Sequence, residues 1–193
     1  MPTLADAIDA LLPQTQCGRC GYAACRPYAQ ALAADECNLN RCSPGGDDTL
    51  AALAALLRRP VLPLDPACGE TLPPRHAVID TEVCIGCTKC IQACPVDAIV
   101  GAGKRLHGVI AQECNGCGLC VAPCPVDCIH LLPQPADSDQ RRAALATVNR
   151  RRYDARQRRL AARTAAAPTP TGPSPDVQTA LARARELLAA RRA

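Results

Sequence analysis

The chain has 193 residues, among them 15 cysteines, three tyrosines, no tryptophan and no phenylalanine, and this composition excludes a large aromatic core. Its longest strongly apolar run, residues 51–57, is far shorter than the roughly 20 residues of a membrane-spanning helix, so no such helix is expected. The formal net charge of +4 combines −5 on residues 1–138 with +9 on residues 139–193, which predicts an acidic body followed by a basic tail.

A chain with so little aromatic bulk needs cross-links to stabilise its fold. The opening segment, residues 1–14, has neither the basic stretch nor the long apolar stretch of a secretory signal peptide. Disulfides occur mainly in secreted proteins, so we expect the cysteines to bind metal in a reducing compartment instead.

Residues 1–59 are predicted to form a small, mostly helical module. Three helices are expected in it: Thr3–Leu12, Tyr22–Ala34 and Leu50–Leu57. Thr3 is the expected N-cap of the first helix, and Asp47 or Asp48 is the expected cap of the third.

Four cysteines of this module have the spacing C-x2-C-x4-C-x16-C: Cys17, Cys20, Cys25 and Cys42. Three closely spaced cysteines in one loop can bind one face of a cubane [4Fe–4S] cluster, and a distant fourth can complete the ligand set. Glycines at positions 18 and 21 let the backbone turn closely around such a centre. Three alternatives remain: a zinc site, a reactive thiol site, and Cys37 as the fourth ligand in place of Cys42.

Residues 60–75 are rich in proline and are predicted to be an extended linker that lies over the following domain. Cys68 lies within this linker and is expected to have no role.

Residues 76–135 contain the spacing C-x2-C-x2-C-x3-C-P twice, thirty residues apart. This pattern is typical of bacterial ferredoxins with two [4Fe–4S] clusters, in which the fourth cysteine of each run binds the other cluster. One cluster is therefore predicted on Cys84, Cys87, Cys90 and Cys124, and the other on Cys94, Cys114, Cys117 and Cys120. Two structural zinc sites are the alternative, but tandem runs that each end in Cys-Pro fit the exchanged ligands of a cluster pair better.

The segments between these cysteines predict short elements and an apolar cover for the clusters. We expect strands at His76–Asp80, Ala98–Val100 and Leu106–Ala111, with about one helical turn at residues 88–93. Six apolar residues are predicted to surround the clusters: Ile85, Ile91, Ile99, Leu119, Val121 and Ile129.

The remaining polar residues of this region receive no catalytic role. Cys128 is predicted to be a core residue, because it replaces Ala98 of the other repeat. Asp97 and Asp127 are expected to form caps or hydrogen bonds near the clusters. Three histidines are expected on the surface or in loops: His76, His107 and His130.

Residues 136–193 form the basic tail, with helices predicted over residues 137–164 and Asp176–Arg192 and a proline-rich linker between them. Three interpretations are open: a solvated and partly disordered tail, a helix that docks on an acidic partner or on the protein's own acidic body, and a helix that binds an anionic membrane surface. Nucleic acid is not expected as a partner, because aromatic residues other than Tyr153 do not alternate with the arginines.

The segments LLPQTQCGRCGY, NRCSPGG and CIGCTKCIQACPVDAIVGA resemble the B subunit of the Rnf-type electron-transport complex, also called Rsx, and the resemblance covers about residues 4–132. It implies one [4Fe–4S] cluster on the first four cysteines and two on the other eight. The complex is implied to pass electrons between reduced ferredoxin and NAD, coupled to ion movement across the inner membrane, with the B subunit as its cytosolic relay. Members of this family begin with a hydrophobic membrane anchor, whereas this chain begins almost at the first cysteine module.

The predicted fold class is thus α+β: a helical four-cysteine module, a ferredoxin fold with two clusters, and an Arg/Ala-rich tail. The predicted function is one-electron relay through three [4Fe–4S] clusters, which needs no acid, base or nucleophile and no small-molecule substrate. Expected partners are other redox proteins, in the cytoplasm or peripherally on the inner membrane. The alternatives are a free-standing soluble polyferredoxin and a redox regulator that uses Cys37 or Cys68.

Overall fold

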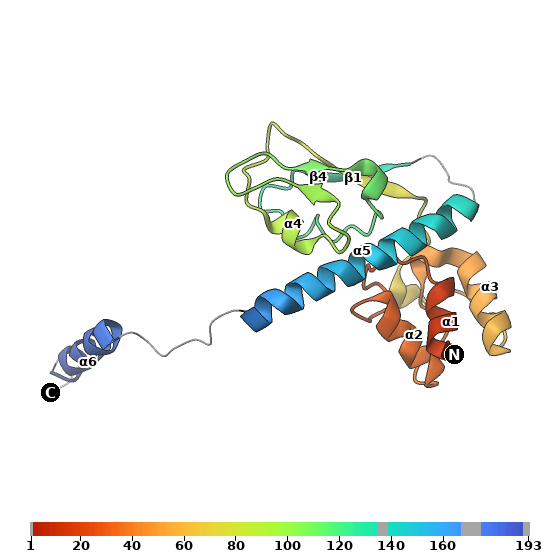
Figure 1. Cartoon of the computed structure of the whole chain (residues 1–193), viewed down its shortest axis with the longest axis horizontal. Helices are drawn as coiled ribbons and strands as arrows, with labels where there is room; N and C mark the ends of the chain where they lie inside the picture. Colours follow the sequence, from red (N-terminus) through yellow and green to blue (C-terminus); the bar gives the residue numbers. More distant parts are fainter. Residues whose placement is uncertain (1, 135–138, 167–174, 191–193) are drawn as a thin grey trace. The chain divides into compact units, whose positions relative to one another are not determined.

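The computed structural model describes residues 2–134, 139–166 and 175–190, and the chain divides into two compact units, Met1–Gln157 and Arg158–Ala193 (Figure 1). The first unit contains all fifteen cysteines. The architecture combines helices with two small antiparallel sheets. Within the described residues, no helix is long and apolar enough to cross a membrane.

The N-terminal module consists of three helices: α1 (Leu4–Leu11), α2 (Cys25–Ala33) and α3 (Gly46–Leu57). Thr3 caps α1 as predicted, because its hydroxyl accepts from the Asp6 amide at 3.2 Å while the Asp6 carboxylate accepts from the Thr3 amide at 2.6 Å. Helix α2 begins at Cys25, later than predicted, because Ala24 before it is extended, with φ of −159° and ψ of 174°.

The predicted start of α3 is wrong. The helix follows a short 3₁₀ turn, η1 (Ser43–Gly45), and its N-cap is Gly45, which makes no side-chain hydrogen bond. Asp47 and Asp48 lie inside the first turn, where their negative charges favour the positive end of the helix dipole.

The core of this module depends on aliphatic residues and one aromatic ring. Ile8, Leu12, Leu32 and Leu53 are buried together with Tyr28, which is 1% exposed. The Tyr28 hydroxyl donates to the Asn38 carbonyl at 3.1 Å and accepts from the Arg41 amide at 3.3 Å. This side chain therefore supplies both apolar volume and backbone partners for the segment that leads to Cys42.

The predicted position of the proline-rich linker over the second domain is wrong. Its central part packs on the N-terminal module, because Asn40 provides partners for its backbone: the Asn40 side chain donates to the Pro63 carbonyl at 2.6 Å, and the Asn40 carbonyl accepts from the Asp65 amide at 2.8 Å. A 3₁₀ turn, η2 (Pro66–Cys68), follows and buries Cys68.

The ferredoxin region contains two separate pairs of antiparallel strands. Strand β1 (Arg75–Ile79) pairs with β4 (Ile129–Pro133), with Ala77 opposite Leu131. Strand β2 (Ile99–Val100) pairs with β3 (Gly108–Val109), and both are shorter than predicted. The predicted helical turn is α4 (Lys89–Ala93), and a 3₁₀ turn, η3 (Ala111–Glu113), precedes the second cysteine run.

The predicted apolar cover is only partly correct. Ile99 and Ile129 are buried, and Ile91 and Val121 pack against the same core. Ile85 lines the pocket that contains Cys84 and Cys87, as predicted, but it is 59% exposed, and Leu119 is 38% exposed. Each of these two residues directly adjoins a cysteine in a tight loop, and a loop that turns the cysteine inward leaves its neighbour facing solvent.

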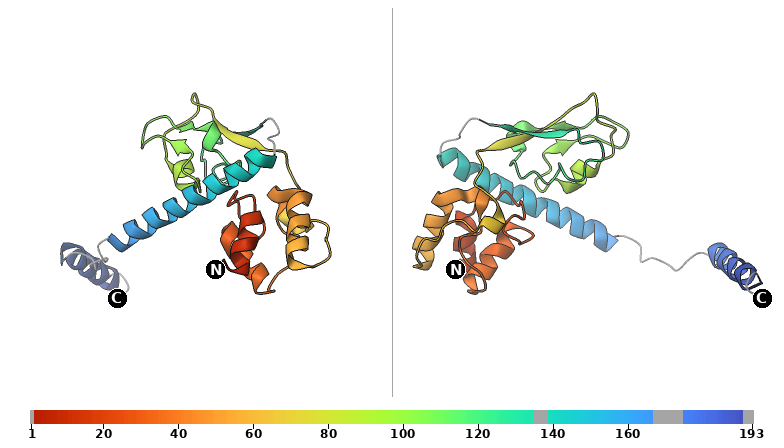
Figure 2. Two further views of the ribbon diagram at one scale, coloured as in Figure 1. Left: turned by 45° about the vertical axis from the view of Figure 1, so that its right-hand side comes forward. Right: turned by 180° about the vertical axis from the view of Figure 1, so that it is seen from behind.

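Both predicted tail helices are present, as α5 (Asp139–Ala166) and α6 (Pro175–Ala190). In the first unit, the part of α5 before Arg158 has the N-terminal helices on one side and the ferredoxin strands on the other (Figure 2). The side chain of Asn149 is buried there. A fully solvated tail is therefore the wrong interpretation for this part of α5.

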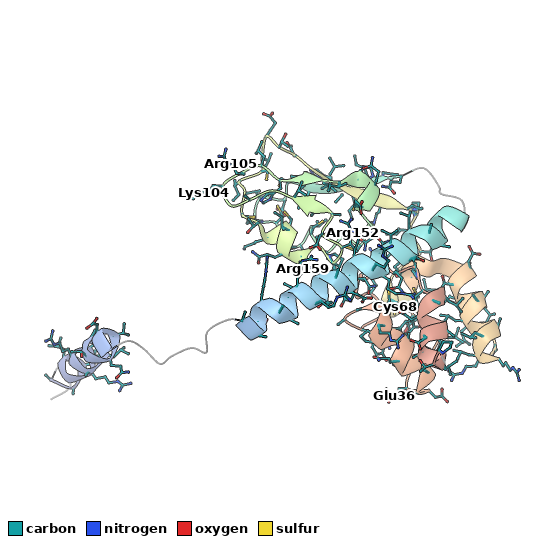
Figure 3. All side chains as sticks on the ribbon, in the orientation of Figure 1. Glu36, Cys68, Lys104, Arg105, Arg152 and Arg159 are labelled. Atoms are coloured by element: carbon teal, nitrogen blue, oxygen red, sulfur yellow. The ribbon has the colours of Figure 1, made fainter. Side chains whose placement is uncertain are left out.

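Three arginines of α5 attach it to the acidic body. Arg150 forms an ion pair of 3.1 Å with Asp9 of α1 and donates to the Asp9 carbonyl at 2.7 Å. Arg152, labelled in Figure 3, donates to the carbonyls of Val96 at 2.7 Å and Asp97 at 3.1 Å and forms an ion pair with Glu113. Arg156 pairs with the Asp97 carboxylate at 3.2 Å. The helix thus binds both cysteine-bearing modules.

Replacing Arg152 and Arg156 together by Gln should weaken this attachment, because hydrogen bonds from a charged donor are worth about 1.5–3 kcal/mol each. We expect the amides of residues 148–157 to exchange hydrogen at least about tenfold faster, as measured by mass spectrometry. The matched control is the double replacement of Arg158 and Arg163, two exposed arginines of the same helix. Equal exchange in both variants would contradict the attachment.

Candidate metal centres

Three cysteines of the first run, one of the second run, and Cys128 line a single pocket. Cys84, Cys87 and Cys90 surround it together with Cys124, and the remaining wall includes the apolar side chains of Ile79, Val126 and Ile129. These are the four cysteines predicted to bind one cluster.

The other four predicted ligands of the ferredoxin region also lie close together. The pKa of the Cys117 thiol is raised to about 12, chiefly by burial and further by the charges of Cys94, Cys120 and Cys114. The pKa of Cys120 is raised to about 11 by burial and by Cys114 and Cys94. These charge effects place the four sulfurs in one region, although no three Cys, His, Asp or Glu side chains among the described residues are arranged to hold a single metal ion.

In the N-terminal module, the charges of other predicted ligands likewise raise the pKa values of Cys25 and Cys42. Burial raises the pKa of Cys25 to about 12, with added contributions from Cys17 and Cys20. Burial also raises the pKa of Cys42, as do the charges of Cys25, Cys17 and Cys20. Cys37 lies beside Tyr22 instead, where its hydrogen bond with the hydroxyl raises the pKa of that tyrosine.

Backbone amides point at several of these sulfurs. The Ala98 amide donates to Cys94 Sγ at 3.2 Å, and the Ala77 amide donates to Cys114 Sγ at 3.4 Å. Burial raises the pKa of Cys124, but hydrogen bonds led by those from the amides of Val126 and Cys128 lower it overall. A thiolate in an apolar site is unfavourable unless a cation and hydrogen-bond donors compensate its charge, so these donor sets fit iron-bound sulfur.

Asp97 and Asp127 explain part of this arrangement, and both lie in the repeated sequence CPVD. They adopt left-handed conformations, with φ of +52° and +49°, which Asp tolerates better than most residues. The turn after Cys94 directs the Ala98 amide at its sulfur, and the turn after Cys124 directs the Val126 and Cys128 amides. Of the two aspartates, Asp127 donates to Cys124 through its backbone amide, whereas the Asp97 carboxylate pairs with Arg156 of α5.

Sequence reasoning missed a buried chain of polar side chains that supports the first cysteine loop. Gln14 Nε2 donates to Asp9 Oδ1 at 3.1 Å, and Gln14 Oε1 accepts from Gln16 Nε2 at 2.8 Å. Gln16 Oε1 in turn accepts from the Cys25 amide at 2.8 Å. Only the folded chain brings these groups together, so no periodic pattern could have indicated them.

Three predictions about single residues have different outcomes. Cys128 is a core residue as predicted, and its sulfur lies 3.5 Å from Cys124 Sγ. Cys68, for which we expect no role, is 3% exposed, and its hydrogen bond with the Arg41 guanidinium raises the pKa of Arg41. His107 lies in a loop, one of its two predicted placements, but it is only 2% exposed, with Nδ1 3.2 Å from Cys90 Sγ.

The two cysteine-bearing modules meet close to their candidate ligands. Asn115 Nδ2 donates to the Thr15 carbonyl at 2.9 Å. Asn115 follows Cys114 directly, and Thr15 lies two residues before Cys17. One hydrogen bond therefore connects the loop that follows Cys114 to the segment that leads to Cys17.

Comparison with known families supports the chemistry of both modules. Residues 77–131 match the family described as a 4Fe-4S dicluster domain, and residues 12–44 match the family described as a putative Fe-S cluster. Together with sulfur-lined, apolar sites and amide donors, these matches define the class: an iron–sulfur protein with a dicluster ferredoxin domain.

Curated relatives identify the family. The chain is 62% identical over 135 residues to the B subunit of the ion-translocating oxidoreductase complex of Alkalilimnicola ehrlichii, in a match that covers 69% of this chain and 73% of the relative. It is 61% identical to proteins of the same name from Azoarcus (67% of this chain, 71% of the relative) and Pseudomonas aeruginosa (69% and 70%). The chain belongs to the family of B subunits of the ion-translocating oxidoreductase complex, and the resemblance inferred from its motifs is confirmed.

Gly116, between Cys114 and Cys117, provides a test of the second cysteine loop. Its φ is +67°, and a Cβ at this position would lie 2.3 Å from the Arg75 carbonyl oxygen. Gly116→Ala should therefore strain the loop by about 1–3 kcal/mol and accelerate cluster loss about tenfold, measured as decay of the visible absorbance. Gly103→Ala is the matched control, because its Cβ would meet nothing within 4 Å. Unchanged decay in Gly116→Ala would contradict this account.

Proposed function

We propose that the chain relays single electrons through three [4Fe–4S] clusters as a subunit of an Rnf-type ion-translocating oxidoreductase complex. The observation that carries this proposal is the pocket in which Cys124 of the second run joins Cys84, Cys87 and Cys90 of the first. The proposed ligands of the second and third clusters are Cys94, Cys114, Cys117 and Cys120, and Cys17, Cys20, Cys25 and Cys42.

When bound, such clusters accept and release one electron at a time. The protein's own residues supply the surroundings. Ile79, Ile99 and Ile129 limit access of water to the sulfurs of the ferredoxin region. Amides such as those of Ala77 and Ala98 stabilise negative charge on sulfur. Relay by this route requires no acid, base or nucleophile, and we assign no catalytic residue.

The junction between the modules supports a linear order of the three clusters. The hydrogen bond from Asn115 to Thr15 joins the loop of Cys114 and Cys117 to the loop that leads to Cys17. Arg150 and Arg152, two residues apart on α5, bind one module each. We infer that the N-terminal cluster exchanges electrons with the cluster of Cys94, Cys114, Cys117 and Cys120, and that the cluster of Cys84, Cys87, Cys90 and Cys124 follows.

The relatives' name states that they are subunits of an ion-translocating oxidoreductase complex. We propose that the partners of this chain are the other redox subunits of such a complex, and that it works on the cytoplasmic side of the inner membrane, held there by protein contacts. No small-molecule substrate or nucleic acid belongs to this proposal.

Metal content tests the ligand sets directly. After anaerobic purification, the full chain should contain about twelve iron atoms and as many sulfides, the content of three cubanes. Cys17→Ser should lower the iron content to about eight while the reduced ferredoxin pair keeps its EPR signal, because the two modules bind their clusters separately.

Cys37→Ser is the matched control for the fourth ligand of the N-terminal cluster. It should retain about twelve irons, whereas Cys42→Ser should lose about four. If Cys37→Ser lost about four irons and Cys42→Ser retained about twelve, Cys37 would be the fourth ligand in place of Cys42. Zinc in the purified protein at this module would refute the cluster.

A further inference from the structure

The loop between β2 and β3 contacts the first cysteine run, and its His107 side chain is buried beside Cys90. The Lys104 amide donates to the Gly86 carbonyl at 3.0 Å, so this loop lies directly on the turn between Cys84 and Cys87. Lys104 and Arg105, labelled in Figure 3, are exposed. His107 is 2% exposed and lines the same pocket as the four cysteines.

His107 touches one of the proposed ligands. Its Nδ1 atom lies 3.2 Å from Cys90 Sγ, well within the range of a hydrogen bond to sulfur. A cysteine that binds iron is a thiolate and has no hydrogen to donate. With the cluster bound, the ring nitrogen must therefore be the donor, which requires the hydrogen to be on Nδ1.

The second ring nitrogen supports the same assignment. Nε2 of His107 is buried and has no hydrogen-bond partner within the described part of the chain. A hydrogen on Nε2 would be a buried donor without an acceptor, and Nδ1 would then direct a lone pair at the thiolate. Both consequences are unfavourable, so the Nδ1–H tautomer is preferred.

The backbone is shaped to accept this ring. A Cβ on Gly101 would lie 2.4 Å from Cδ2 of His107 and 3.0 Å from the Leu106 carbonyl oxygen. Only glycine leaves space for the imidazole at this point. The ring is therefore held in place by the loop that connects β2 to β3 and runs from Gly101 to His107.

We propose that His107 is a positioning residue that donates an N–H···S hydrogen bond to Cys90 and raises the reduction potential of the cluster on Cys84, Cys87, Cys90 and Cys124. The proposal rests on the proposed function, because it requires that cluster. Reduction adds negative charge that spreads onto the ligand sulfurs, so a donor at sulfur stabilises the reduced state more than the oxidised state.

The test is a redox titration of the anaerobically purified full chain, followed by EPR. His107→Phe keeps a ring of similar size and removes the donor. It should lower the equilibrium constant for reduction of this one cluster about tenfold, a fall of about 59 mV for one electron. The affected signal is identified as the one that Cys124→Ser abolishes, and the potentials of the other clusters should not change.

Two further variants separate hydrogen bonding from packing. His107→Asn can place an amide N–H near the position of Nδ1, and it should restore most of the potential. His130→Phe changes an exposed histidine of β4 and should leave all potentials unchanged. In the wild type labelled with ¹⁵N-histidine, pulsed EPR should detect a coupled nitrogen at this cluster that His107→Phe removes.

The outcomes distinguish this inference from the function on which it rests. A wild-type chain without about twelve irons, or without [4Fe–4S] signals, would overturn the proposed function itself. Full iron content in His107→Phe with an unchanged potential would overturn only the role of His107. A fall in potential that His107→Asn does not reverse would also overturn it, because loss of packing would then be the cause.

Discussion

In the ligand sets that we propose, the two cysteine runs of the ferredoxin region share their ligands, and the folding of this region depends on that exchange. Cys124 joins Cys84, Cys87 and Cys90, and Cys94 joins the second run, so neither loop forms a complete proposed site alone. Burial makes free thiolates unfavourable at Cys117 and Cys120, as their raised pKa values show. Cluster binding and folding are therefore interdependent, as in other metal-stabilised small domains.

The strands of the ferredoxin region are short because its fold depends on the cysteine loops more than on strand pairing. A two-residue pair such as β2–β3 cannot be stable alone, and the pairing of β1 with β4 joins the two ends of the domain. The repeated CPVD turns, with left-handed Asp97 and Asp127, direct backbone amides at the preceding cysteines. Sulfur and amide hydrogen bonds thus replace the aromatic core that the composition lacks.

The charge asymmetry of the chain has a structural counterpart in its first unit. The basic helix α5 places Arg150 on Asp9 of the N-terminal module and Arg152 and Arg156 on the turn after Cys94. This attachment supplements the hydrogen bond between Asn115 and Thr15. The two cysteine-bearing modules are thus connected both directly and through a helix that lies outside both of them.

The sequence by itself determined the class of chemistry, because tandem cysteine runs at fixed short spacings followed by proline are typical of cluster-binding loops, and the twelve candidate ligands are visible without a structure. It also predicted α1, β1 and the turn of α4, whose signals are local. Only the tertiary structure decided which side chains surround the sulfurs. His107 and Cys68 are buried beside residues more distant in the chain, such as Cys90 and Arg41, and the linker packs on Asn40 in the same way. Such contacts leave no periodic signal, since each depends on two segments that meet only after folding.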